Sequence, residues 1–314
     1  MNGMESPITL QQRSKPVLKT EISFIIVHLL PLGALFTGAT WFDWALCAFL
    51  YFFRMFWVTG GYHRYFSHKS YRTSRFFQFI IAFMAQTSAQ KGALWWAAHH
   101  RHHHRHSDTP EDPHSMKLYG FWYSHVGWIV GPDYKETDYK TIGDYAKYPE
   151  LVWLNKYYLV PPLMLAIGVT ALGAWVNGGS AALMFTHYGL STLFIGFFLS
   201  TVILYHGTFS INSIMHKFGN QRYESGDESK NSLWLALLTL GEGWHNNHHY
   251  YEVASRQGFF WWEIDITWYI LKMMSWTGLV WDLKDVPDHI KHSRNKDHAR
   301  ELKARMDQSP ASAA

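Results

Sequence analysis

Apolar and polar residues are segregated into long blocks along this chain. Four blocks approach the roughly 20 apolar residues that a helix needs to cross a bilayer, and they span residues 22–41, 42–59, 158–176 and 183–205. One short turn joins the first two blocks and another joins the last two. The pattern therefore predicts an all-α integral membrane protein in which four transmembrane helices form two hairpins.

Lysine and arginine are absent from both short turns, at 41–43 and 177–180, and gather in the termini and the two long connections. Positively charged loops tend to stay on the cytosolic side of a membrane. Two hairpins also return the chain to the side from which it started, so charge and helix number agree. We therefore expect a multi-pass protein whose termini and active site are cytosolic, with a helical cap beside the membrane.

Residues 76–98 are apolar but contain Gln78, Gln86, Gln90 and Lys91. A fifth span here would break the parity of the hairpins, so we predict a helix pair lying at the membrane surface. The predicted parts are a cytosolic N-terminal segment (1–21), a first hairpin (22–59), a first part of the cap (60–157), a second hairpin (158–205), a second part of the cap (206–292) and a polar C-terminal tail (293–314).

Polar side chains inside the predicted spans allow two interpretations. Arg54 either extends to the cytosolic interface or faces the active site, because a charge at the bilayer centre costs at least about 2.5 kcal/mol. His28, His187 and His206 are interpreted as packed or hydrogen-bonded histidines rather than ligands.

The composition narrows the chemistry further. Hydrophobic residues make up 48% of the chain and aromatic residues 18%, which suits membrane interfaces and apolar tunnels. The single cysteine, Cys47, excludes an internal disulfide and a thiolate-only metal site. No G-x-G-x-x-G motif is present, so electrons for any redox reaction should come from a partner. The net charge of +4 lacks a basic tract with interleaved aromatics, and we expect no nucleic-acid partner.

Histidine clusters lie just outside the apolar blocks. Two of them, HRHHH and HNNHH, place histidines at positions i, i+3 and i+4, which share one face of a helix. Two further motifs, HRYFSH and NSIMH, complete a set of candidate ligands. The set consists of His63, His68, His100, His103, His104, His216, His245, His248 and His249.

Nine imidazoles are too many for one ion, so we predict two metal ions. Histidine ligation suits zinc, copper, iron or nickel, but a structural zinc needs four ligands in a closed shell. Open positions around two ions favour oxygen activation by iron. Asn212, one helical turn before His216, could hold a water on one ion, and Asp108, Asp112 and Glu242 are candidates to orient the imidazoles. The remaining histidines near the clusters are assigned to supporting or surface positions: His99, His102, His106, His114 and His125.

These motifs and their flanks, including GGYHRYFSH, SDTPEDPH and GEGWHNNHH, resemble the membrane fatty-acyl desaturases, most closely the Δ9 stearoyl-CoA type. The resemblance covers about two-thirds of the chain. It implies two irons bound by the nine histidines and by a water on Asn212, and the insertion of a cis double bond with consumption of O2. An H-P-G-G haem motif is missing, so a fused cytochrome b5 is not expected. The resemblance implies a separate ferredoxin or cytochrome b5 with an NAD(P)H reductase.

The acyl carrier stays open at this stage. Animal acyl-CoA desaturases of this family carry Arg and Asp directly before the first histidine of the motif that corresponds to HRHHH. This chain has Ala98 and His99 there. A long-chain acyl-CoA is the favoured substrate, and a phospholipid of the bilayer is the rival. A histidine-box hydroxylase of alkanes or lipids is the alternative activity. A metal transporter is disfavoured, because transporters place polar sites near the bilayer midplane.

Residues one to four turns before His63 are expected to line the closed end of the acyl tunnel, as the resemblance implies. Helical spacing alone selects Cys47, Tyr51 and Met55. A smaller side chain at Tyr51 should then admit longer acyl chains.

Overall fold

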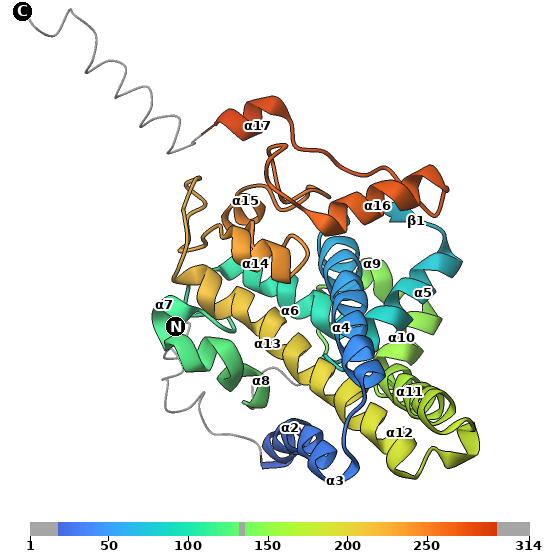
Figure 1. The fold of residues 1–314 in the computed structure, drawn as a ribbon. Coiled ribbons are helices and arrows are strands. Elements are labelled where there is room, and N and C mark those ends of the chain that lie inside the picture. Colours follow the sequence, from blue (N-terminus) through green and yellow to red (C-terminus); the bar gives the residue numbers. More distant parts are fainter. Residues whose placement is uncertain (1–17, 132–135, 294–314) are drawn as a thin grey trace, which may run out of the picture.

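The computed structural model describes residues 18–131 and 136–293. Most of the N-terminal segment (1–21) and nearly all of the C-terminal tail (293–314) predicted from the sequence lie outside these residues. The described part is almost entirely helical, and a group of long helices extends away from a region of shorter helices and loops (Figure 1).

Among the described residues, three helices are long and apolar enough to cross a membrane. The first joins α4 (Trp41–Phe56) to the π-helix η2 (Trp57–Ser67), and the second is α11 (Val160–Gly178). The third, His187–His216, is continuous in α12 (His187–Thr192), η5 (Leu193–Leu199), α13 (Ser200–Ser213) and η6 (Ile214–His216). The mostly helical class is therefore confirmed, and these three helices are candidate membrane spans.

The first predicted span is a shorter and interrupted helix. Its apolar part covers Glu21–Thr37, and Pro31 lies in its 3₁₀ turn, where proline removes a backbone donor. This segment consists of α2 (Leu18–Leu29), η1 (Leu30–Gly33) and α3 (Ala34–Thr37). The four-span count accordingly stays a prediction.

Buried polar contacts join the long helices. Asp43 completes a capping box with Thr40 at the start of α4 and also accepts a hydrogen bond from Thr192. Arg54 is fully buried, and its guanidinium donates to the hydroxyls of Ser200 and Thr201 at 2.5 and 2.8 Å. Arg54 therefore ties α4 to α13, and it does not extend to an exposed interface as one of our two interpretations held.

The predicted helix pair at 76–98 is present as α5 (Arg75–Gln86) and α6 (Ala93–His106). Both pack on η2, and buried Tyr62, Phe66 and Ile81 belong to the main hydrophobic core there. The other short elements of the described residues are α7 (Met116–Tyr119), η3 (Tyr123–Gly127), α8 (Trp128–Val130), α9 (Gly143–Ala146), α10 (Pro149–Lys156), η4 (Ala181–Leu183), α14 (Leu233–Leu238), α15 (His245–Tyr250), α16 (Ile266–Trp276) and α17 (Asp288–His292).

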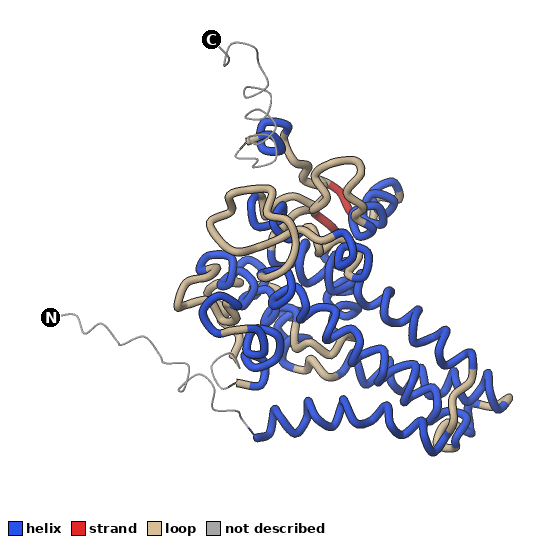
Figure 2. Tube along the Cα trace, turned by 60° about the vertical axis from the view of Figure 1, so that its left-hand side comes forward, coloured by secondary structure: helices blue, strands red, loops and turns tan. Residues whose placement is uncertain are grey.

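A two-stranded antiparallel sheet joins β1 (Arg72–Thr73) to β2 (Val280–Trp281). It holds the chain after α16 against the segment that follows η2. We call the region of shorter helices and loops the cap. Figure 2 shows this pair of strands among the loops of the cap, away from the ends of the long helices that extend from it. The ligand-bearing elements α6, α15 and the end of η2 lie in this cap region.

Candidate metal centre

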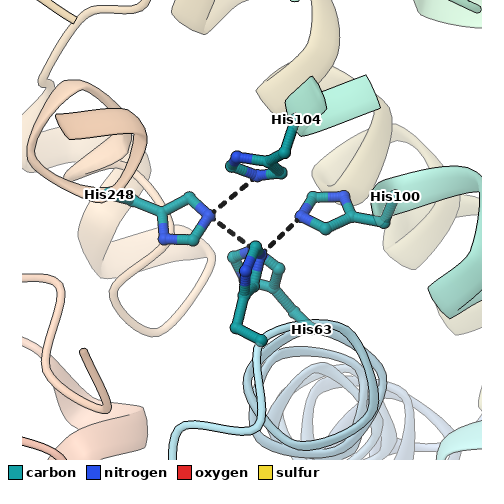
Figure 3. A group of neighbouring side chains, drawn as sticks. His63, His100, His104 and His248 are labelled. Carbon is teal, nitrogen blue, oxygen red and sulfur yellow. Dashed lines mark hydrogen bonds between the residues drawn. The ribbon is translucent and has the colours of Figure 1, made fainter. Parts of the chain in front are cut away.

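Five histidines converge on one small volume inside the cap. The Nε2 atoms of His63 and His248 are 2.9 Å apart, and Nε2 of His248 lies 3.0 Å from that of His104. His68 and His100 approach each other equally closely, with 3.0 Å between their Nε2 atoms. One ring nitrogen from each of the five lies within 4.8 Å of the others. Figure 3 shows four of these rings pointing toward one another from three separate elements. We call these residues the five-histidine cluster.

A second cluster adjoins the first. His103, His216 and His249 each bring one ring nitrogen within 4.8 Å of the others. The Nε2 atom of His245 lies 3.0 Å from that of His216. We call these four residues the four-histidine cluster. The structure thus gathers all nine predicted ligands into two neighbouring groups.

Residues between the ligands fix the two helices that carry them. Arg101, inside the HRHHH motif, donates to the carbonyl oxygens of Phe66 and Ser67 at 2.6 and 2.9 Å, which joins α6 to the end of η2. Asn246 and Asn247, inside HNNHH, are fully buried on the other face of α15. Their amides bond the loop backbone at Tyr223 and Gln257. The motif therefore holds its own helix in place, which sequence reasoning did not anticipate.

Carboxylates face the outer nitrogens of several ligands. The three carboxylates named from the sequence lie there: Glu242 bonds Nδ1 of His63, Asp112 lies 2.9 Å from Nδ1 of His103, and Asp108 lies 4.0 Å from Nδ1 of His216.

Sequence reasoning missed two further carboxylates. Asp227 lies 2.5 Å from Nδ1 of His249, and Glu252 lies 3.0 Å from Nδ1 of His104. Glu252 follows the last histidine of the HNNHH motif by three residues, so its nearness in sequence could have identified it. Asp227 is far from every box in sequence, and its loop reaches His249 only through the fold. The sequence predicts a supporting or surface position for His114. The structure places its ring beside a predicted ligand, with 4.2 Å between the centroids of His114 and His103.

A buried ionic network contacts the five-histidine cluster through Glu242. Arg64 lies 3.0 Å from Glu242 and 2.9 Å from Asp265, and all three side chains are at most 8% exposed. Burial by itself would raise the pKa of Glu242, but His63 and Arg64 outweigh burial and lower the pKa. Glu242 is therefore an ionised acceptor for the Nδ1 hydrogen of His63.

The donor set fits metal ions. Burial and neighbouring imidazoles hold the pKa of each of five ligands far below the usual histidine range, so the rings are neutral, as ligation requires; these are His68, His100, His104, His245 and His248.

The orientation of the rings fits metal ions as well. Carboxylates only accept hydrogen bonds, so Nδ1 of His103 donates to Asp112 and Nε2 is the nitrogen left to bind a metal ion. Nε2 of His249 is buried without a hydrogen-bond partner within the described ranges. Converging lone pairs repel one another unless a cation lies between them.

Two cavities meet at the clusters. The larger has a volume of about 460 Å³, and Phe24 and Val27 of α2 line it together with several aromatic side chains. The smaller lies against Met55 and Val58 of the first long helix. Residues common to both cavities include His100 and Asn212. A chain-like apolar molecule could therefore pass along the histidines.

The three predicted tunnel residues lie at different depths. Met55 lines the smaller cavity. Tyr51, one turn earlier, is buried, and its hydroxyl donates to the carbonyl of Leu238 at 2.8 Å. Cys47 is buried another turn away and lines neither of the two cavities.

Comparison with known proteins assigns the family. The fatty acid desaturase family model matches residues 39–299. An sn-1 stearoyl-lipid 9-desaturase of Anabaena variabilis is 33% identical over 288 residues, covering 88% of this chain and 98% of that protein. The chain belongs to the fatty acid desaturase family. The resemblance inferred from the histidine motifs is thereby confirmed, and the protein is an oxidoreductase of the desaturase class.

Other relatives differ in the acyl carrier that their names state. An sn-2 palmitoyl-lipid 9-desaturase of Nostoc sp. (strain 36) is 35% identical over 76% of this chain and 81% of its own length. An acyl-CoA 5-desaturase of Anemone leveillei is 33% identical over 88% of this chain and 82% of its own length. Desaturases of this family thus act on acyl lipids or on acyl-CoA.

Proposed function

We propose that this protein is a di-iron, O2-dependent desaturase that inserts a cis double bond, at Δ9, into a saturated long-chain acyl group. The observation that carries this proposal is the meeting of nine histidines with an apolar cavity. His100 belongs to the five-histidine cluster and also lines both cavities. An acyl chain in these cavities would pass beside the metal ligands, where its CH2 groups can react.

The two clusters would each hold one iron, and Asn212 would hold a water on one of them. Iron, when bound, activates O2 for removal of hydrogen from unactivated CH2 groups. Burial keeps five of the ligand imidazoles neutral, and carboxylates orient several of the rings. Stacked aromatic rings such as Trp96 on His100, with centroids 4.9 Å apart, restrict the position of the chain. Such positioning decides which carbon reacts.

The reaction consumes one O2, two electrons and two protons together with two acyl hydrogens, and yields two water molecules. A separate ferredoxin or cytochrome b5, served by an NAD(P)H reductase, is proposed as the electron source. In the proposed topology, four helices cross the membrane and both termini and the cap lie in the cytosol. The metal centre would then be accessible to an electron donor on the cytosolic side.

The carrier of the acyl chain is the finer part of the proposal. The resemblance of the motifs favours acyl-CoA. The residues that line the larger cavity make a membrane lipid the second candidate. Lys91 is the one lysine or arginine among the described residues that line the larger cavity, and α2 contributes apolar side chains to it. Multiple phosphates of CoA would call for several cations, whereas a glycerolipid could enter from the bilayer.

The test combines metal analysis with a carrier assay. Purified protein loaded with Fe2+ under anaerobic conditions should hold two irons per chain. Supplied with O2, a reductase and a ferredoxin, it should convert labelled stearoyl chains to cis-monounsaturated chains. Parallel assays with stearoyl-CoA and with a stearoyl glycerolipid in vesicles separate the two carriers. Hydroxylated products would move the assignment to the hydroxylase alternative, and conversion of neither carrier would reject the proposal.

A further inference from the structure

An exposed carboxylate faces the five-histidine cluster. The carboxylate of Glu252 lies 3.0 Å from Nδ1 of His104 and 3.7 Å from Nδ1 of His68 through the same oxygen, Oε2. The Glu252 side chain is 47% exposed. The carboxylates that face other ligands are at most 8% exposed, in Asp108, Asp112, Asp227 and Glu242. Glu252 is therefore the exposed member of this group.

Three separate segments meet at this carboxylate. His68 immediately follows η2, His104 lies in the last turn of α6, and Glu252 follows α15. His104 and His248 also touch through their Nε2 atoms at 3.0 Å. Because the Glu252 carboxylate lies 3.0 Å from the outer nitrogen of His104 while Nε2 faces the cluster, it is placed to fix the tautomer and the ring orientation of His104.

We propose that Glu252 is a positioning residue that holds His68 and His104 in the orientation needed to bind metal in the five-histidine cluster. The inference rests on the proposed di-iron function. Ligands whose outer hydrogen bond is lost typically give a 10–100-fold weaker site. Since Glu252 is exposed and belongs to none of the buried core clusters, its removal should weaken the metal site without unfolding the cap.

The experiment compares Glu252→Ala and Glu252→Gln with wild type and with a matched control, Glu228→Gln. Glu228 is similarly exposed, at 45%, and its carboxylate pairs with Lys117 and Lys230 rather than with a ligand. Each protein is loaded anaerobically with Fe2+. The measurements are iron per chain, the rate of iron loss to a chelator, the Mössbauer spectrum and the melting temperature of the metal-free protein.

The expected result is that Glu252→Ala keeps its melting temperature but loses one of two irons about 10–100-fold more readily. The amide oxygen of Glu252→Gln can still accept the Nδ1 hydrogen of His104, so this variant should lie between Ala and wild type. Glu228→Gln should match wild type in every measurement.

Two outcomes would overturn the proposal. Wild-type iron retention and an unchanged Mössbauer spectrum in Glu252→Ala would show that His104 is positioned without this carboxylate, while the di-iron function would stand. A wild-type protein that binds no iron in its histidine clusters would remove the proposed function and this inference together.

Discussion

At the scale of single residues, two imidazoles of the five-histidine cluster differ in how they are supported. His63 has a buried, ionised acceptor in Glu242, which Arg64 neutralises on its other side. Nδ1 of His248 is buried and has no hydrogen-bond partner in the part of the chain that the structure describes. His248 is instead located by its contacts with other ligands, so its ring should be the more sensitive of the two to loss of metal.

Asn212 gives a first prediction at this scale. It lines both cavities beside His100, and the proposal assigns it a water ligand rather than a direct bond. Asn212→Ala should therefore leave iron content nearly intact and reduce turnover strongly. Iron analysis and product formation on the same sample provide the measurement. Loss of one iron in the variant would instead make Asn212 a direct ligand.

Tyr51 gives a second prediction. Its hydroxyl group donates a hydrogen bond to the carbonyl oxygen of Leu238. A Cβ atom on Gly207 would lie 2.9 Å from that hydroxyl oxygen. The helices are thus in close contact at this end of the cavity. Tyr51→Ala should open space beyond Met55 and shift the products toward longer acyl chains. Gas chromatography of the products measures the shift, and an unchanged length profile would contradict the assignment of Tyr51 as the stopper.

The sequence predicted residues well where spacing determines geometry. His100, His103 and His104 lie three and four positions apart, so any helix there brings them to one face. Asp227 could not be identified, because only a long loop brings it to His249. The two interpretations of Arg54 could not be separated for a similar reason: its hydroxyl partners, Ser200 and Thr201, come from a helix far along the chain.

At the scale of elements, the first long helix continues past the end predicted at Thr59. The helical structure runs on to Ser67 as a π-helix and carries His63 into the cap. π-Helical segments occur often at functional sites. The apolar pattern ends near Thr59 because glycines, His63 and Arg64 follow in the sequence, and hydropathy alone cannot show that the backbone stays helical.

Close helix packing gives a third prediction, with a control in the same helix. A Cβ atom on Gly173 of α11 would lie 2.0 Å from the hydroxyl of Thr192, whereas one on Gly168 would meet nothing within 4 Å. Gly173→Ala should push α11 away from the neighbouring helix and lower the melting temperature in detergent. Gly168→Ala should leave the melting temperature unchanged or raise it, since alanine favours helices. Equal effects of both variants would contradict this packing.

At the scale of the whole molecule, the membrane topology depends on the segment Glu21–Thr37. With three crossings the two termini lie on opposite sides of the membrane, and with four they lie on the same side. Within residues 18–131 and 136–293, the structure contains three helices of sufficient length and a shorter apolar one. Sequence patterns predicted the helical membrane class and the helix pair at α5 and α6, but not the interruption by Pro31 in the first segment.

Topology is therefore the fourth prediction. Reporter domains fused in turn to the N-terminus and to the C-terminus should both be cytosolic, because the positively charged segments all fall on one face. A fusion at the turn near Ser180 serves as the control and should report the opposite side. Termini on opposite sides would contradict the four-span arrangement.

Desaturation itself is tested most directly by the fatty-acid profile of cells that express this chain. Cells with a matching electron donor are compared with cells that carry His248→Ala, which removes a ligand, and with His187→Ala, a histidine outside both clusters. We predict new cis-monounsaturated acids with wild type and His187→Ala, and none with His248→Ala. Unsaturated products that persist in His248→Ala, or no new product from wild type with its donor present, would contradict the account.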